Sequence, residues 1–334
     1  MDKFKKQGII YFIILIMGGV SAWAKVSVHE AKKLGVTGTP LIPTGATRAG
    51  NADGSIPEWT GGIKSPPVGY KEGDFHPMPF PDDKPLFTIT CENFEQHKEY
   101  LTGGMVALFK TYPKTFKMNI YKTYRTASSP DWVYKASLEN AVAAELIEDG
   151  NGITNARATS PFPIPKNGLE AIWNHVLHHR LHSLARCIVQ AATSRDGQYL
   201  LIKTTEKILC PYANPNGKLK RILEDNIFIY GLQIITSPAR LAGTATLVHD
   251  TINQVKNPRR AWEYNIGQRR VRRAPNVAYD YPRNASDGLR TTDDWDFYNG
   301  APDRYNWKLV GKKESTLLTI VISSTATTLN MLIF

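Results

Sequence analysis

The sequence is poor in cysteine and lacks the short motifs by which many catalytic sites are recognised. It contains only Cys91, Cys187 and Cys210, and none has the Cys-x-x-Cys spacing of a metal site. A Gly-x-Ser-x-Gly elbow, a P-loop and a dinucleotide fingerprint are all missing. These absences lower the expectation of an enzyme without excluding one, and they predict a protein without a cofactor.

The three cysteines are expected to be buried free thiols. Asp196 and Gly197 predict a hairpin turn. In that hairpin Cys187 would lie opposite Glu206. Cys210 would then lie four residues further along, about 13 Å away at the rise of a strand, which is too far for a disulfide.

The first 24 residues have the three parts of an export signal. Lys3, Lys5 and Lys6 precede an uncharged stretch over residues 8–23, and Ala-Trp-Ala at 22–24 is a small-x-small cleavage site. The apolar core is shorter than the roughly 20 residues that span a bilayer, and no cysteine lies near the cleavage site to carry a lipid. We therefore expect a signal peptide cleaved after Ala24 and a soluble periplasmic protein.

The charge balance of the expected mature chain is basic. Of 41 basic and 30 acidic residues, the leader holds three and one, which leaves 310 residues with a formal charge of +9. Because an exported protein seldom meets nucleic acid, this excess indicates either attraction to an anionic membrane surface or simply solubility. Nucleic acid is therefore not an expected partner.

The segment after the leader contains many residues that interrupt regular structure. Residues 35–85 hold nine glycines and nine prolines, which excludes long helices and strands. The aromatic side chains of Trp59, Tyr70, Phe75 and Phe80 are available to anchor such a segment on a domain surface. We predict an ordered but irregular N-terminal arm.

Helical patterns follow the arm, and strand patterns follow the helices. Helices are predicted over residues 91–101, 105–112 and 167–179, with another from residue 130. Strands are predicted over residues 183–193, 199–211, 226–236, 239–250 and 260–266, and residues 269–273 are expected to form a return strand after a turn at 265–268. This order predicts an α+β fold with an antiparallel sheet.

The strand predicted over residues 226–236 is apolar on both faces. Phe228, Tyr230, Leu232 and Ile234 alternate with Ile227, Ile229 and Ile235. A strand with one face in water would instead alternate apolar and polar residues. Helices can cover one face, while the other requires a second layer, a curl of the same sheet or an apolar ligand. An ordinary buried central strand is the simplest interpretation of this pattern.

Four histidines provide the candidate metal site. His175, His178, His179 and His182 are spaced i, i+3, i+4 and i+7, so a continuous helix would bring them to one face, where zinc could bind. This cluster supports an alternative function, a periplasmic metal-dependent hydrolase. The repeat contains no carboxylate to act as a base, however, and Arg180 and Arg186 would repel a cation. A solvated helix end is therefore favoured, and no metal site is predicted.

Two charged stretches follow the last predicted strands. Five aspartates within residues 287–303 do not have the spacing of an EF-hand loop, which favours roles in caps, turns and pairs with arginines over a calcium loop. The arginines at 269–273 are expected to face water or lipid head groups. The aspartates are Asp287, Asp293, Asp294, Asp296 and Asp303.

Seven strings, taken together and in order, resemble an exported proteobacterial family catalogued as domain of unknown function 1329 (DUF1329). The resemblance covers about Val26 to Glu314 and predicts a single domain over residues 25–314. The strings are NADGSIPEWTGG (51–62), DKPLFTI (83–89), PFPIP (161–165), IWNH (172–175), PARLAG (238–243), GQRRVRRAP (267–275) and SDGLRTTDD (286–294).

The resemblance has implications for fold and function. The family is similar to outer-membrane lipoprotein-sorting carriers, which implies a strongly curved antiparallel sheet, a half-closed barrel, with helices on its concave side. The implied function is to bind and move a lipid or other hydrophobic molecule across the periplasm, often beside a resistance-nodulation-division type transporter and an outer-membrane barrel. No catalytic residues are implied. At His178, His179 and His182 this chain departs from the family pattern, which weakens a shared metal role.

The sequence therefore predicts a carrier or accessory protein that binds a hydrophobic ligand, rather than an enzyme. A purely structural envelope protein without a ligand is a further alternative. The side chains expected to line the ligand site are those of Phe228, Tyr230, Leu232, Leu247, Trp262 and Tyr264, although the sequence does not determine which sheet face turns inward.

The last 20 residues differ from the rest of the chain. Residues 315–334 contain no charge and eight serines or threonines, and the resemblance to the family is expected to stop at Glu314. A shifted or truncated reading frame is the favoured explanation. A C-terminal membrane anchor is disfavoured because the hydroxyl groups leave this stretch only moderately apolar.

Overall fold

The computed structural model describes residues 26–316, apart from 72–73, 75–76, 78, 195, 219–221, 223, 275–276, 278 and 284–285. The predicted export signal and residues 317–334 of the atypical tail lie outside the described residues. The part of the chain that is described contains no helix that is both long enough and apolar enough to cross a membrane.

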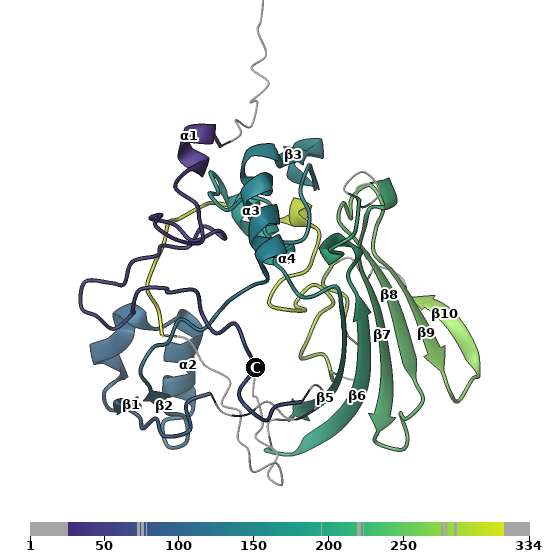
Figure 1. The fold of residues 1–334 in the computed structure, drawn as a ribbon. Coiled ribbons are helices and arrows are strands. Elements are labelled where there is room, and N and C mark those ends of the chain that lie inside the picture. Colours follow the sequence, from purple (N-terminus) through teal and green to yellow (C-terminus); the bar gives the residue numbers. More distant parts are fainter. Residues whose placement is uncertain are drawn as a thin grey trace, which may run out of the picture.

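The fold is α+β, as predicted, with few helices and one large antiparallel sheet (Figure 1). The helices are α1 (Val28–Ala31), α2 (Gly103–Thr111), α3 (Asp131–Ala143) and α4 (Gly168–Val176), with 3-10 turns at Phe94–Tyr100, Glu148–Gly150, Pro211–Ala213 and Pro302–Arg304. The small strand pairs are β1 (Phe87–Ile89) with β2 (Met118–Ile120), and β3 (Glu145–Ile147) with β4 (Gly152–Thr154).

The large sheet consists of six strands that are neighbours in sequence order. They are β5 (Ser183–Thr193), β6 (Tyr199–Leu209), β7 (Ile227–Ser237), β8 (Ala245–Thr251), β9 (Arg260–Asn265) and β10 (Arg270–Ala274). Strands β5 and β10 form its two edges and do not pair with each other. The expected half-closed barrel is therefore wrong in this respect: the sheet is open and not strongly curled.

Two turns of the sheet are displaced from their predicted positions, and the pairing of their strands changes with them. Thr193 pairs with Tyr199, so residues 194–198 form a five-residue connection instead of a two-residue turn. Cys187 consequently lies opposite Thr205 and is exposed, and only Cys210 is buried. The connection between β9 and β10 likewise occupies residues 266–269, because Arg270 pairs with Asn265.

The glycine- and proline-rich arm is ordered and irregular through most of its length. Trp59 is 2% exposed, and its indole nitrogen donates a hydrogen bond to the carbonyl of Ala127 at 2.9 Å. Its ring meets that of Tyr134 edge-on at 6.2 Å. The last described residues return to this arm, where Asn51 donates to the Glu314 carboxylate at 3.1 Å.

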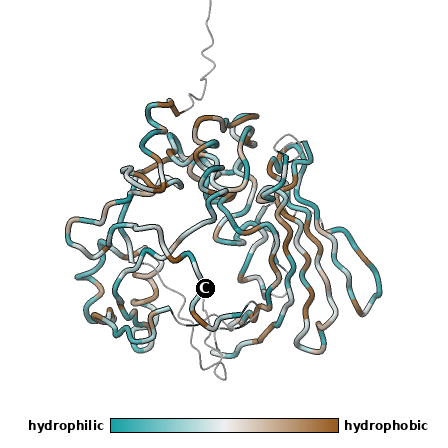
Figure 2. Tube along the Cα trace, viewed as in Figure 1, coloured by the Kyte–Doolittle hydropathy of each residue, from teal (hydrophilic) through white to brown (hydrophobic). Residues whose placement is uncertain are grey.

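The resemblance implied that helices lie across the concave side of the sheet, and they do not. In Figure 1, α3 and α4 gather at one end of the sheet. A large hydrophobic cluster lies there: Trp173 of α4 and Leu177, just after that helix, join Ile229 of β7 and Ile252 beyond β8. Figure 2 shows hydrophobic residues recurring along β6 to β9, beyond the reach of these helices. Another segment must therefore cover the middle of the sheet.

Candidate functional site

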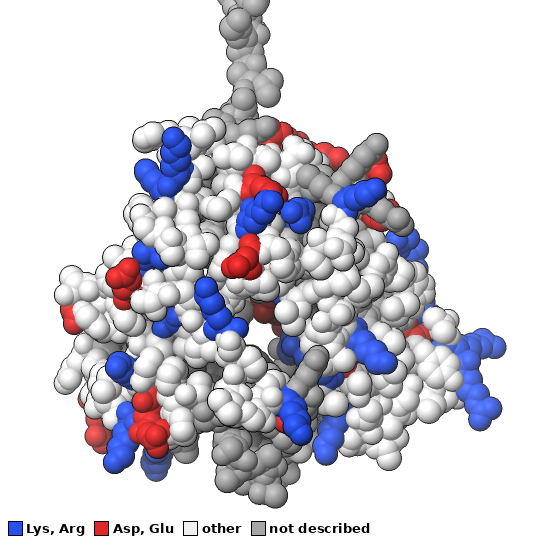
Figure 3. Space-filling model, viewed as in Figure 1, with Lys and Arg blue, Asp and Glu red and all other residues white. Residues whose placement is uncertain are grey.

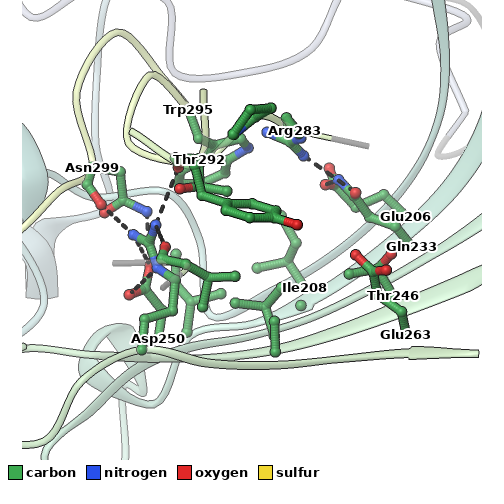
Figure 4. A pocket seen from close by; sticks show the side chains of 18 residues that line it. Glu206, Ile208, Gln233, Thr246, Asp250, Glu263, Arg283, Thr292, Trp295 and Asn299 are labelled. Carbon is green, nitrogen blue, oxygen red and sulfur yellow. Dashed lines mark hydrogen bonds and ion pairs between the residues drawn. The ribbon is translucent and has the colours of Figure 1, made fainter. Parts of the chain in front are cut away.

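A cavity lies against the middle of the six-stranded sheet, and rows of paired residues form its floor (Figure 4). One row is apolar and runs across four strands from Ile208 through Gly231 and Val248 to Ala261. The next row is polar and runs from Glu206 through Gln233 and Thr246 to Glu263. Both rows line the cavity, so its floor changes from apolar to polar over two residues along each strand.

The cavity exists because two residues of its floor have little or no side chain. Gly231 has no side chain, and a β-carbon built there would meet only the Ile229 side chain, at 4.0 Å. Ala261 adds only a methyl group in the same row. Glycine inside a strand weakens the strand and often marks a site where another group approaches. The cavity therefore follows from two small residues between larger neighbours.

The roof of the cavity is formed by the described residues of the irregular segment 277–299, which we call the cover. Its cavity-lining residues are Val277, Tyr281, Pro282, Arg283, Thr292, Trp295 and Asn299. Part of the cover is held together by its own hydrogen bonds: Thr292 N–H donates to the carbonyl of Tyr281 at 2.9 Å. The cover takes the position that helices were expected to occupy.

A buried arginine fastens the cover to the sheet. Arg259, directly before β9, forms a two-pronged pair with Asp250, with Nε to Oδ1 at 2.9 Å and Nη2 to Oδ2 at 3.0 Å. The same guanidinium donates to the carbonyls of Val277 and Thr292, each at 3.1 Å, and to that of Asn299. Burying a charge pair is costly unless its hydrogen bonds are satisfied, and here the cover satisfies them.

A second arginine holds the cover at the helical end. Arg180 pairs with Asp296 at 2.5 Å, and its guanidinium lies 5.6 Å from the centre of the Phe228 ring and 5.4 Å from that of Trp295. Burial lowers the pKa of Arg180, while Asp296 opposes that change. Cation-π contacts of this kind add to the attraction between the core and the cover.

The polar end of the cavity contains Arg283, which comes from the cover. Its guanidinium donates to the Gln233 amide oxygen at 3.2 Å, and the Gln233 amide nitrogen donates to Glu206 at 2.5 Å. Glu206 is 3% exposed and also pairs with Arg186 at 2.5 Å. Burial lowers the pKa of Arg283 to about 10, so it remains a cation at neutral pH. Glu206 and Asp294 attract it from longer range.

The cavity has a volume of about 130 Å³. A cavity of roughly 150 Å³ lined by apolar side chains accommodates benzene. Figure 4 shows Asp250 and Asn299 at one end, Arg283 and Gln233 at the other, and Ile208 between them. The site therefore suits a short apolar group that carries a polar group at one end.

None of the six residues predicted to line a ligand site lines this cavity. Leu232, Leu247 and Trp262 pair in one row on the opposite face of the sheet, and Tyr230 and Tyr264 belong to rows beside it. Side chains alternate between faces, so the residues next to them in sequence line the cavity instead. Five of the six predicted lining residues therefore lie on the face opposite this cavity.

Phe228 is separated from this pattern by a β-bulge. The register of β7 against β8 shifts between Ile227 and Ile229. Phe228 is 1% exposed and packs edge-on against Tyr212 in the same core cluster as Ile229. A bulge inserts one residue and interrupts the alternation of faces, which the sequence pattern did not reveal.

The four histidines do not converge on a metal site. Helix α4 ends at Val176, so His178, His179 and His182 do not continue its face. Each of the four ring systems has a ring nitrogen within 3.1 Å of a backbone carbonyl, and these carbonyls belong to Asp296, His175, Ala158 and Cys210. Over the described residues there is no group of three or more potential metal ligands from histidine, cysteine, aspartate and glutamate.

The aspartates mostly have the structural roles that their spacing suggested. Asp293 accepts from the Thr291 hydroxyl at 2.6 Å, Asp294 pairs with Arg290 at 3.4 Å, and Asp296 pairs with Arg180. Asp303 accepts from the Tyr279 hydroxyl at 2.9 Å. These contacts stabilise the cover and the segment after it.

The family model described as protein of unknown function DUF1329 matches residues 88–322. The match continues eight residues past Glu314, where the resemblance had been expected to stop. The uncharacterized protein PA3922 of Pseudomonas aeruginosa is 50% identical over 296 residues, which make up 87% of this chain and 63% of that protein. The chain thus spans less than two thirds of that relative's length.

Two solved structures show partial similarity. A DUF1329 family protein from Desulfovibrio piger is 20% identical, with a TM-score of 0.29 over 39% of this chain and 47% of that one. An outer membrane lipoprotein-sorting protein domain from Vibrio parahaemolyticus is 18% identical, with a TM-score of 0.23 over 33% of this chain and 40% of that one.

Proposed function

This chain belongs to the DUF1329 family, and we propose that it is a periplasmic carrier that binds a hydrophobic ligand in the cavity between its sheet and its cover. The observation that carries this proposal is the apolar floor row with glycine at its centre. Ile208 and Val248 flank Gly231, so a ligand resting on that row contacts apolar side chains on both sides. Binding there requires little more than a shaped apolar surface with a few orienting polar groups.

The polar end of the cavity defines the ligand more closely. Arg283 and Gln233 lie one row beyond Gly231 and offer N–H donors to a head group. Hydrogen bonds to a charged donor are stronger than those between neutral groups. A single-chain amphiphile with an anionic or polar head matches the apolar floor row and the N–H donors beyond it, and the cavity volume limits the part enclosed to a few carbons.

The periplasmic location rests on the basic, apolar and Ala-Trp-Ala succession of residues 1–24. The role of carrier, rather than catalyst, rests on the sequence, which lacks a nucleophile motif. It also rests on the histidines at 175–182, which form no group of three or more potential metal ligands over the described residues. A transporter or an outer-membrane barrel would be the corresponding partner.

Filling the cavity from its floor provides the test. Gly231→Leu adds a side chain where nothing lies closer than 4.0 Å, in backbone that does not require glycine. We expect the affinity for a fluorescent fatty-acid probe to fall at least tenfold, measured by fluorescence titration. Stability should stay the same or rise, because glycine inside a strand is unfavourable by roughly 0.5–1 kcal/mol relative to alanine.

Gly103→Leu is the matched control. Gly103 is exposed at the start of α2 and has no atom within 4 Å of a β-carbon built on it. This variant should bind the probe as the unchanged protein does. Unchanged probe binding by a folded Gly231→Leu protein would show that the ligand does not occupy this cavity.

A further inference from the structure

The face of the six-stranded sheet opposite the cavity, here called the outward face, is apolar in the middle and basic at its sides. One row of paired residues crosses five strands from Lys207 through Leu232, Leu247 and Trp262 to Arg273. Both cations of this row are exposed. The row therefore places three apolar side chains between two positive charges.

Neighbouring rows continue this pattern. Tyr230, His249 and Trp262 form a ladder in which successive rings meet edge-on with centres 4.7 Å apart. Arg260 is exposed and pairs with His249, which puts a third cation at the margin of the ladder. On the other side of the central row, Tyr264 pairs with Val271.

Some of the apolar side chains of this face are exposed to solvent, and others are half-buried. Ile234 and Leu247 are each 37% exposed, and Val271 is 63% exposed. Exposed apolar side chains that lie together on one surface usually mark a site of interaction. In Figure 3 the surface over β8 to β10, at the right of the view, is mostly white with blue side chains at its edge.

Acidic side chains are segregated to the other face. Strands β5 to β10 contain three carboxylates, those of Glu206, Asp250 and Glu263, and all three line the cavity. The outward face of these strands consequently carries cations without a carboxylate. Its charge is complementary to an anionic surface.

From this arrangement we infer that the outward face docks on an anionic lipid surface. Tyrosine and tryptophan rings reside at the head-group level of membranes, where one end of the ring is apolar and the other wet. Lysine and arginine beside them gain about 1 kcal/mol each near anionic lipids. The apolar row would contact the boundary of the acyl chains, while Lys207, Arg260 and Arg273 would contact lipid phosphates.

The combination favours a lipid surface over an acidic protein. An acidic protein would satisfy the cations but would leave Leu247, Ile234 and the exposed hairpin residue Val271 facing polar groups. A lipid surface satisfies both, because charge and apolar contact lie in successive layers of the same interface. This inference does not depend on whether the cavity on the other face binds a ligand.

The test is sedimentation of the purified protein with vesicles. We expect binding to vesicles of phosphatidylcholine mixed with phosphatidylglycerol, little binding to phosphatidylcholine alone, and weakening of the binding as salt is raised. The variant Lys207→Glu/Arg273→Glu should bind the anionic vesicles roughly 20-fold or more weakly, since each cation near the surface contributes about 1 kcal/mol.

Strand β10 supplies a matched control. Arg270 and Arg272 alternate with Val271 and Arg273 and lie on the other side of the strand, so Arg270→Glu/Arg272→Glu makes the same change in net charge. This control should keep most of the binding. Equal loss in both double variants would overturn the inference, because the binding would then depend on net charge and not on the outward face.

A second variant tests the apolar contact. Val271→Ser removes an exposed side chain and is not expected to affect folding. It should weaken vesicle binding severalfold in high salt, where apolar contact dominates. Failure of the unchanged protein to bind anionic vesicles, or its capture by an acidic protein surface alone, would overturn the assignment to lipid.

Discussion

The two faces of the large sheet come from the same six strands but differ in almost every property. The cavity face holds Gly231 and Ala261 together with all three strand carboxylates, and the cover encloses it. The outward face holds the ring ladder and exposed cations. Side chains one position apart along a strand therefore take part in two different surfaces.

Acidic and basic side chains of the six-stranded sheet are distributed unequally between its two faces. Asp250 and Glu206 can lie on the cavity face because Arg259 and Arg186 pair with them there. Their side chains consequently do not neutralise the cations of the outward face. Substitutions at adjacent residues therefore act on different faces.

The largest effect is expected where the cover is fastened. Arg259→Ala leaves Asp250 buried without its partner and removes the hydrogen bonds to Val277 and Thr292. Loss of one partner of a buried pair costs about 3–5 kcal/mol, and urea unfolding should report a loss of that size. Binding of the fatty-acid probe should fall as well, because the cover is no longer held.

Arg260→Ala is the adjacent control for this prediction. Arg260 is exposed on the outward face, so its removal should change the free energy of unfolding by no more than about 0.5 kcal/mol. Similar losses in the two variants would contradict the assignment of Arg259 as the residue that fastens the cover.

The bulge in β7 provides the second comparison. Phe228→Ala empties a position that is 1% exposed in the core and should cost about 3–5 kcal/mol. Tyr230→Ala, two residues further along and half-buried on the outward face, should cost only about 1–2 kcal/mol. Chemical denaturation of both variants measures the difference. Equal costs would contradict the separation of the two rings by the bulge.

The smallest effect concerns pH and the outward face. Burial among its neighbours and the nearby charge of Arg260 lower the pKa of His249 below its ordinary value of 6.5. At mildly acid pH, His249 therefore binds a proton more readily in the unfolded chain than in the folded protein. The stability that depends on this group is fully present above about pH 6.5 and falls as the pH drops below it. Unfolding curves at about pH 8 and pH 5 should show a smaller acid loss for His249→Gln than for the unchanged protein. An identical loss would contradict this prediction.

The strands could be predicted because their signals are local. The spans 183–193 and 260–266 agree with β5 and β9 to within one residue, since apolar alternation and turn residues lie next to each other in the chain. The shift in the β5–β6 hairpin arose because two turn residues do not determine the length of a connection. Strand β8 begins at Ala245, six residues later than predicted, because a turn hydrogen-bonded from Leu241 to Pro238 precedes it.

The cavity residues were missed because their signal is weak. Gly231, in the middle of an apolar strand, was the sequence feature that could have identified the cavity face, since glycine there often marks a close approach. Arg259 and Arg283 carried no signal of their own. Arginines in a basic sequence resemble surface residues until a partner such as Asp250 is found beside them.

The sequence by itself determined the class of fold, the order of the strands and the apolar character of β7 on both sides, because these depend on residues close together in the chain. The tertiary structure alone decided which face encloses a cavity. That choice depends on contacts across long separations, such as Arg259 with Asn299, and on one extra residue at the bulge before Ile229. Alternation along a strand defines two faces, but only the packing of a distant segment against one of them makes the two faces different.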